Sequence, residues 1–229
     1  MKKSLLITLA AAVMLLSFTR VSAQVPEQNI GIRLLPSAMP DNGAGRLPKI
    51  NTFAFGIGPV SRLHRVAGQD MSVTYGLQIS LEDCHRSTMF FGYSAGVDFG
   101  TYRKTAYTLS ASLLENADLT EMYLDFPVRI RLYIPFSRRY QAYLFGGLVP
   151  SLCLGSHFYS EEEHKYVSSF DEGPNGSRVD LLAGGGMGLE INDQVRIALG
   201  YDYGLLDRDR NEGPKLLVSA IKLNMSYFF

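Results

Sequence analysis

The sequence contains no tryptophan, only two cysteines and no excess of charge of either sign. With 22 basic and 22 acidic residues in 229, it lacks the cationic surface that binding to nucleic-acid phosphates requires. No apolar run reaches the roughly 18 to 20 residues of a membrane-spanning helix. These absences argue against a nucleic-acid partner and against a helical membrane anchor.

The beginning of the sequence predicts secretion. Lys2 and Lys3 precede an apolar run over residues 5–18, and Val21-Ser22-Ala23 forms a small-x-small cleavage pattern. This arrangement is typical of a signal peptide, predicted here over residues 1–23. Its removal takes away Lys2, Lys3 and Arg20, which leaves a mature net charge of about −3.

Alternation of apolar and polar residues is the main structural signal in the mature chain. It is clearest from Leu119 to Ile134, where the even positions are apolar and the odd positions include Glu121, Asp125 and Arg129. Such a pattern is typical of β-strands with one apolar and one polar face. Pro127 interrupts this run and predicts a bulge or a local break, because proline cannot donate a ladder hydrogen bond.

Eight segments of this kind predict the fold. They are Asn51–Pro59, Met71–Leu81, Ser87–Tyr102, Leu119–Ile134, Tyr140–Gly155, Arg178–Ile191, Gln194–Leu206 and Leu216–Phe229. We expect an all-β fold, an eight-stranded antiparallel transmembrane β-barrel over residues 51–229, with lipid-facing and lumen-facing side chains alternating. In Tyr140–Gly155 both faces are apolar, so its register stays open.

Residues 24–50 differ from the rest, because they contain four prolines and a glycine-rich patch. We predict an extended periplasmic arm, with an extra strand near residues 30–34 as the alternative.

The connections predict an orientation. Those near 82–86, 135–139 and 192–194 are short, whereas those near 61–70, 103–118, 157–177 and 207–215 are long. Bacterial barrels place short turns in the periplasm and long loops outside the cell. We therefore expect an outer-membrane location with both termini periplasmic. Cys84 and Cys153 would then lie at opposite ends of the barrel, beyond the roughly 7 Å Cα separation that a disulfide allows.

The lumen-facing charges predict the candidate site. A barrel of eight strands is about wide enough to be filled by its own side chains. Inward residues of both signs should then form an ionic network that braces the wall and blocks ions, and a three-residue turn at 192–194 sets Glu190 opposite Arg196. The predicted members of this network are Asp125, Arg129, Arg131, Arg178, Asp180, Glu190, Arg196 and Asp202. Other residues expected to point inward are Gln78, Asp98, Glu121 and Lys222.

The last segment predicts an insertion signal. Met225, Tyr227 and Phe229 continue an apolar alternation up to an aromatic end, which is similar to the signal by which the barrel-assembly machinery recognises outer-membrane barrels.

Catalytic patterns are weak in this sequence. Ser156 and His157 are adjacent on a predicted strand, so their side chains point to opposite faces and cannot form an activated nucleophile. His157, Glu161–Glu163 and His164 have no fixed ligand spacing for a metal. Gly184–Gly186 with Gly188 lacks the helix and lysine of a phosphate loop and instead predicts a narrow, curved wall. We therefore expect no catalytic residue, cofactor or metal.

Several short motifs carry a family resemblance. They are Tyr123-Leu124-Asp125-Phe126-Pro127-Val128, Ala142-Tyr143-Leu144-Phe145-Gly146-Gly147, residues 182–189, residues 199–205 and Tyr227-Phe228-Phe229. In them the chain resembles the PorT-type outer-membrane β-barrel family of the Bacteroidetes. The resemblance implies an outer-membrane location, contacts with membrane lipid and lipopolysaccharide, and secretion-system subunits as partners. Gly200 stands where the family often has a basic residue.

Four functional hypotheses remain open at this stage. The first is a structural or interaction barrel, including a PorT-like component of protein secretion. The second is a narrow outer-membrane channel, and the third is an outer-membrane enzyme. The fourth is a soluble lipocalin-like carrier, whose ionic residues would point outward and whose apolar residues would point inward.

Overall fold

The computed structural model describes residues 51–66, 71–88, 90–109, 114–135, 139–160, 165–168, 170, 177–208 and 215–229. The signal peptide predicted at 1–23 and the arm predicted at 24–50, with its alternative strand, lie outside this part of the chain. Within the described ranges, no helix has the length and apolarity needed to cross a membrane.

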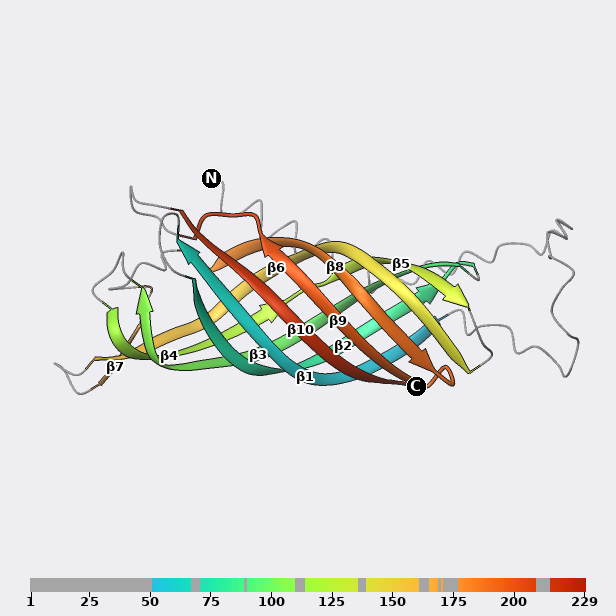
Figure 1. Ribbon diagram of the computed structural model, residues 1–229, viewed down its shortest axis with the longest axis horizontal. Coiled ribbons are helices and arrows are strands. Elements are labelled where there is room, and N and C mark those ends of the chain that lie inside the picture. Colours follow the sequence, from blue (N-terminus) through green and yellow to red (C-terminus); the bar gives the residue numbers. More distant parts are fainter. Residues whose placement is uncertain are drawn as a thin grey trace, which may run out of the picture. The chain divides into compact units, whose positions relative to one another are not determined.

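The described residues form ten β-strands (Figure 1). Their bounds are β1 Asn51–Val66, β2 Ser72–Arg86, β3 Phe91–Leu109, β4 Leu114–Asp125, β5 Val128–Pro135, β6 Tyr140–Ser160, β7 Lys165–Ser168, β8 Val179–Ile191, β9 Val195–Gly204 and β10 Leu216–Phe228.

Strand pairing closes the sheet into a barrel. Antiparallel ladders join β1 to both β2 and β10, and further ladders join β2 to β3, β6 to β8, β8 to β9 and β9 to β10. Between β3 and β6, β4 and β5 follow one another in a single position of the ring. The short β7 pairs only with β6 among the described strands. The predicted eight-stranded antiparallel barrel is therefore confirmed.

The gap between β4 and β5 lies at Phe126 and Pro127. The register is unchanged across it, because β3 pairs Asp98 with Asp125 before the gap and Ala95 with Val128 after it. Of the two predicted forms, Pro127 produces a local break in the strand and no bulge.

The two ends of the barrel differ. One end, called here the turn end, carries Ser87, Arg139, Asn192 and Phe229 (right in Figure 1). At its tightest turn, Asn192 and Asp193 both have φ of 54°, and the Gln194 N–H donates to the Ile191 carbonyl at 3.1 Å. Asn and Asp tolerate this left-handed backbone better than most residues. The opposite end, where β1, β6 and β9 finish, is called the loop end.

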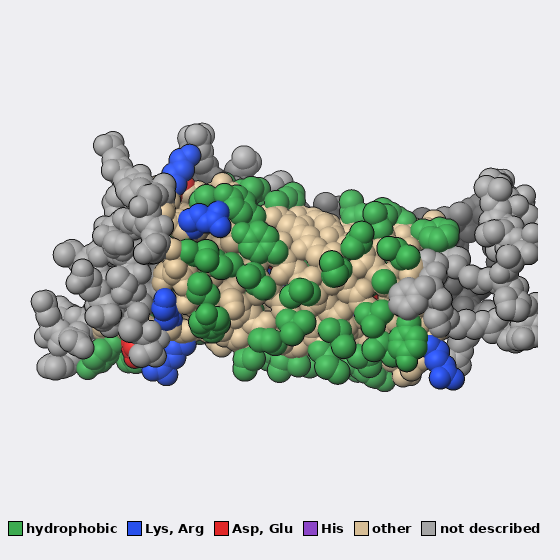
Figure 2. All heavy atoms as spheres, viewed as in Figure 1, with side chains coloured by type: hydrophobic (Ala, Val, Ile, Leu, Met, Phe, Trp, Pro, Cys, Tyr) green, Lys and Arg blue, Asp and Glu red, His purple; other side chains and the backbone are tan. Residues whose placement is uncertain are grey.

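Apolar side chains cover the outside of the barrel. Among the even positions predicted to face outward, Leu124 and Phe126 are half-buried and the others are exposed, from Met122 at 37% to Ile130 at 54%. Glu121, Asp125 and Arg131 are buried inside. Figure 2 shows apolar side chains over the middle of the visible face, with Lys and Arg side chains near its two ends. This is the reverse of a lipocalin-like carrier, whose apolar face points inward.

β6 has a register that the sequence left open. Tyr143, Phe145 and Val149 point inward and are buried, whereas Leu144 and Leu148 are 47% and 49% exposed on the outside. Large apolar side chains on both faces are possible here because the inner ones fill the lumen.

The predicted long loops at the loop end are wrong in part. Residues 61–66, 103–109, 114–118 and 157–160 continue strands. The predicted turn at 82–86 is also wrong, because β2 continues to Arg86 and the turn follows it. In these stretches the outward side chains no longer need to be apolar, so the alternation fades although the hydrogen-bonded ladder continues.

Candidate functional site: the charged interior of the barrel

The interior of the barrel holds charges of both signs in similar numbers. Among the described residues, eight basic and seven acidic side chains occupy inward positions. The basic ones are Arg62, Arg86, Lys104, Arg129, Arg131, Arg196, Arg208 and Lys222, and the acidic ones are Glu82, Asp98, Glu121, Asp125, Asp180, Glu190 and Asp202. Burying a charge without a partner is costly, so balance and pairing are conditions for this interior to fold.

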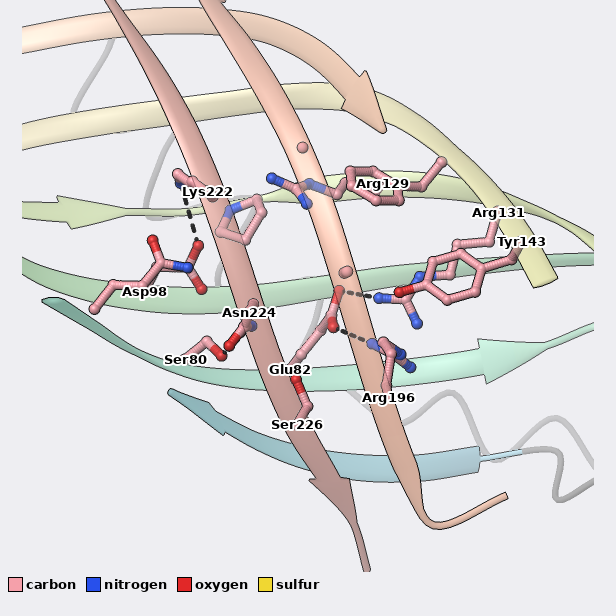
Figure 3. A pocket seen from close by; sticks show the side chains of 15 residues that line it. Ser80, Glu82, Asp98, Arg129, Arg131, Tyr143, Arg196, Lys222, Asn224 and Ser226 are labelled. Carbon is pink, nitrogen blue, oxygen red and sulfur yellow. Dashed lines mark hydrogen bonds and ion pairs between the residues drawn. The ribbon is translucent and has the colours of Figure 1, made fainter. Parts of the chain in front are cut away.

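Lys222 is the hub of a central group of ion pairs. Its ammonium lies 2.9 Å from a carboxylate oxygen of Asp125, 3.3 Å from one of Asp98 and 3.5 Å from one of Asp202. Arg62 also pairs with Asp125 at 2.7 Å, and Arg129 pairs with Asp202 at 3.1 Å. β1, β3, β4, β5, β9 and β10 each contribute one of these side chains, so the group ties together opposite walls of the barrel. Figure 3 shows Lys222, Asp98 and Arg129 of this group.

A turn-end group is built around Glu82 of β2. Its two carboxylate oxygens accept separate hydrogen bonds from Arg131 and from Arg196, the latter at 2.6 Å. Glu190 accepts from Arg196 and from Arg86, each at 3.3 Å. The predicted pairing of Glu190 with Arg196 is therefore present, but each of these carboxylates has a second guanidinium partner that the sequence did not suggest.

Cys84 lies within the turn-end group. Its sulfur is 3.2 Å from a guanidinium nitrogen of Arg131 and 3.3 Å from one of Arg196. Cys84 and Cys153 are both buried and free, as expected, and they belong to separate apolar clusters.

A loop-end group surrounds the fully buried Glu121. It lies 3.1 Å from Nε2 of His64 and accepts hydrogen bonds from the hydroxyls of Tyr123 at 3.0 Å and Ser156 at 3.4 Å. Arg208, from the segment after β9, is completely buried and donates to the Tyr123 hydroxyl. A connecting segment therefore contributes to the filling of the lumen.

Apolar clusters fill much of the remaining interior and leave little space. Near the loop end, β1, β4, β6, β7 and β10 supply an apolar cluster of Val66, Leu119, Phe158, Val167, Leu216 and Val218. Two small cavities of about 30 Å³ each lie in the described interior, one beside the central group (Figure 3) and one at the turn end. A cavity of this size holds a water molecule or two and no larger ligand.

The structure places most, but not all, of the predicted network residues together. Asp125, Arg129, Arg131, Glu190, Arg196 and Asp202 take part in the ion pairs described above. Arg178 does not, because it is exposed, with its guanidinium 4.5 Å from the centre of the Phe170 ring. Asp180 is buried and accepts the Leu181 N–H at 2.7 Å, and it has no ion pair with a described residue.

Six interior residues were missed by sequence reasoning: Arg62, His64, Glu82, Arg86, Lys104 and Arg208. The first five continue the inward even positions of β1, β2 and β3, so extending those strands past Pro59, Leu81 and Tyr102 would have found them. No periodic signal could have found Arg208, because it lies outside a strand.

The glycine-rich part of β8 has a steric role. A Cβ added at Gly184 would lie 2.1 Å from the Tyr201 carbonyl oxygen and 2.6 Å from an Asp202 carboxylate oxygen. A side chain there would therefore displace the backbone of β9 or the carboxylate that Lys222 and Arg129 bind.

The weak catalytic patterns do not assemble into a site in the described residues. Ser156 is fully buried and bonded to Glu121, whereas the neighbouring His157 lies on the other face of β6. Glu161–Glu163 and His164 lie outside the described residues. Within those residues, no three His, Cys, Asp or Glu side chains are grouped so that they could hold a metal ion.

The residues of the predicted insertion signal lie on the outside of the barrel at the turn end. Met225, Tyr227 and Phe229 are 58%, 48% and 70% exposed, and the rings of Tyr227 and Phe229 pack edge to face at 5.4 Å. The Phe229 N–H donates to the Phe53 carbonyl at 2.8 Å, so the end of the chain is bonded to β1.

Comparison with known proteins gives structural likeness alone. No family model matches the chain, and no curated protein sequence matches it. The attachment invasion locus protein Ail of Yersinia pestis is 15% identical, with 79% of this chain and 100% of that one covered and a TM-score of 0.45. Neisserial surface protein A is 11% identical, with 77% and 97% covered and a TM-score of 0.47. The outer membrane protein OprG from Pseudomonas aeruginosa is 14% identical, with 79% and 97% covered and a TM-score of 0.41.

Proposed function

We propose that the protein is an integral outer-membrane β-barrel of a bacterium, with a structural or interaction role and no catalytic chemistry. One observation carries this proposal: a closed barrel has its apolar side chains outside and its paired charges inside. A closed barrel satisfies all of its backbone hydrogen bonds, which is the condition for strands to cross lipid. The predicted signal peptide supports export to that membrane.

The filled interior favours a structural role, in which side chains brace the barrel wall, and argues against a channel. Ion pairs link opposite walls in the turn-end and central groups, and Glu121 contacts side chains of β1, β4 and β6 in the loop-end group. An apolar cluster of Val60, Tyr102, Tyr123 and Cys153 fills a further part of the lumen. Cavities of about 30 Å³ do not form a continuous aqueous path. The expected behaviour is therefore a barrel that conducts poorly.

Within this class, we propose a PorT-like component of protein secretion that acts through its loop-end or arm surfaces. The support is the set of short motifs in β4, β6, β8 and β9 described above. The proposed orientation has both termini in the periplasm, with the barrel-assembly machinery and outer-membrane lipid as partners. Secretion-system subunits are the partners that this role requires.

Three experiments test the proposal. Expressed protein should fractionate with the outer membrane and migrate faster in unboiled than in boiled detergent gels, and recovery in the soluble periplasm would overturn the location. Purified protein in planar bilayers should give no stable porin-sized conductance.

Affinity purification from outer-membrane extracts should recover secretion subunits, and recovery of the barrel alone would count against the PorT-like role.

A further inference from the structure

The outer rim of the loop end carries basic side chains next to the apolar surface. On the face shown in Figure 2, Lys and Arg side chains gather mainly at the loop-end side. At this end, Arg65 near the end of β1 and Lys215 just before β10 are exposed and have no ion pair with a described residue. Exposed cations that no described carboxylate pairs with, beside an apolar band, are positioned to meet anionic groups.

Strand register brings these two side chains close together. Arg65 pairs with Leu217 of β10, and Lys215 lies two residues before Leu217 in the same outward alternation. Diagonal neighbours of this kind are about 7 Å apart in antiparallel strands. Two long basic side chains at that spacing can both reach one phosphate group.

Tyr203 of β9 completes one side of the proposed site. The Arg65 guanidinium carbon lies 5.9 Å from the centre of the Tyr203 ring. A cation over an aromatic face keeps its N–H groups available at the edges, which suits bidentate recognition of phosphate. The ring therefore orients the guanidinium without occupying its donors.

The depth of the site matches a lipid headgroup. On β10 the outward apolar run extends from Ile221 to Phe229, which is nine residues and close to the length of a membrane-spanning strand. Leu217, opposite Arg65, lies four residues beyond Ile221. At about 3.3 Å per residue and a tilt of about 45°, this is roughly 9 Å above the apolar edge, within reach of the headgroup layer for a long side chain.

We propose that Arg65, Lys215 and Tyr203 form a binding site for a phosphate group of the lipid A headgroup in the outer leaflet. The proposal rests on the proposed function, because it needs the loop end to face that leaflet. Arg103 provides a matched control on the same rim. It is also exposed to solvent, but its guanidinium is already paired with Asp118 at 3.5 Å.

The test is native mass spectrometry of the detergent-solubilised full chain titrated with lipid A, with phosphatidylglycerol and with inorganic phosphate. The variant Arg65→Gln/Lys215→Gln should bind lipid A more weakly by on the order of thirtyfold. The Arg103→Gln variant should bind lipid A as the unmodified chain does. Inorganic phosphate should bind neither the Arg103→Gln variant nor the unmodified chain. The single variants Arg65→Gln and Lys215→Gln should each show an intermediate loss, about fivefold.

Unchanged lipid A affinity in the double variant would overturn the site. Equal affinity for inorganic phosphate, or for phosphatidylglycerol, would overturn lipid A as its ligand. Gel mobility of unboiled samples, measured on the same preparations, separates this inference from the proposed function. A barrel that inserts but shows no effect of the substitutions refutes the site alone, whereas an unmodified chain that does not insert refutes the membrane role.

Discussion

Replacement of Lys222 by methionine tests the balance of the central group. Asp125 would keep Arg62 at 2.7 Å and Asp202 would keep Arg129 at 3.1 Å, but Asp98 would lose its ion pair, the one it forms within the described chain. Breaking a buried pair from one side costs about 3 to 5 kcal/mol, because a charge is left uncompensated. We expect Lys222→Met to lower the free energy of unfolding by that amount.

A compensating substitution separates charge from packing. Asp98→Asn alone leaves Lys222 with Asp125 at 2.9 Å and Asp202 at 3.5 Å, so its cost should be smaller, about 1 to 2 kcal/mol. The double variant Lys222→Met/Asp98→Asn restores electroneutrality. It should be more stable than Lys222→Met alone, with a coupling energy of about 2 kcal/mol.

The assay is equilibrium unfolding in urea of barrels inserted in lipid vesicles, followed by gel mobility and tyrosine fluorescence. All three variants are compared with the unmodified chain at one lipid composition. An unchanged urea midpoint for Lys222→Met would contradict the role of Lys222 in the central group. A double variant whose loss of unfolding free energy equals the sum of the two single losses would also contradict it, because the two charges would then be uncoupled.

Three further predictions concern the turn-end group, the lipid face and the glycine-rich strand. Arg196→Ala should lower the unfolding free energy by about 3 kcal/mol, near the lower limit for a broken buried pair, because Glu190 and Glu82 each keep one partner. An unchanged urea midpoint of unfolding would contradict this prediction. Val128→Arg, near the bilayer midplane, should lower the unfolding free energy by about 2 to 4 kcal/mol, whereas Ile134→Arg, closer to the turn end, should lower it by about 0 to 1 kcal/mol. Equal losses of stability in vesicle refolding would contradict the assignment of this face to lipid. Gly184→Ala should destabilise the barrel by about 1 to 3 kcal/mol, whereas Gly146→Ala, whose added Cβ would meet its nearest neighbour at 3.6 Å, should be tolerated; thermal melting in detergent compares them.

The fold was predictable because alternation is strong wherever one face meets lipid. In residues 119–134 the even apolar positions face outward, whereas the odd charged positions face inward beside the buried Leu119, Tyr123 and Tyr133, so strand type and face followed from spacing alone. The pair of Glu190 and Arg196 followed from one tight turn. The sequence pattern was therefore sufficient to predict contacts between residues that are close together in the sequence.

Strand ends were less predictable, since the constraint on the outward face disappears beyond the membrane. Arg62 and Glu82 were missed for this reason, although both lie on the inward face of strands that were otherwise identified. The central hub could not be found from the sequence either. Lys222 and Asp98 are 124 residues apart and lie on strands that are not neighbours, so their contact depends on barrel closure.

The long strands described above have a consequence for how the protein can diversify. β3 has 19 residues and β6 has 21, about twice the 9 to 11 that cross a bilayer, and the excess lies at the loop end. These strand extensions form a hydrogen-bonded collar at the loop end, and an apolar cluster fills its interior. We expect that exchange of residues 110–113 or 161–164 for unrelated sequences leaves insertion and the described lumen unchanged, so the barrel can serve as a constant base for variable connections.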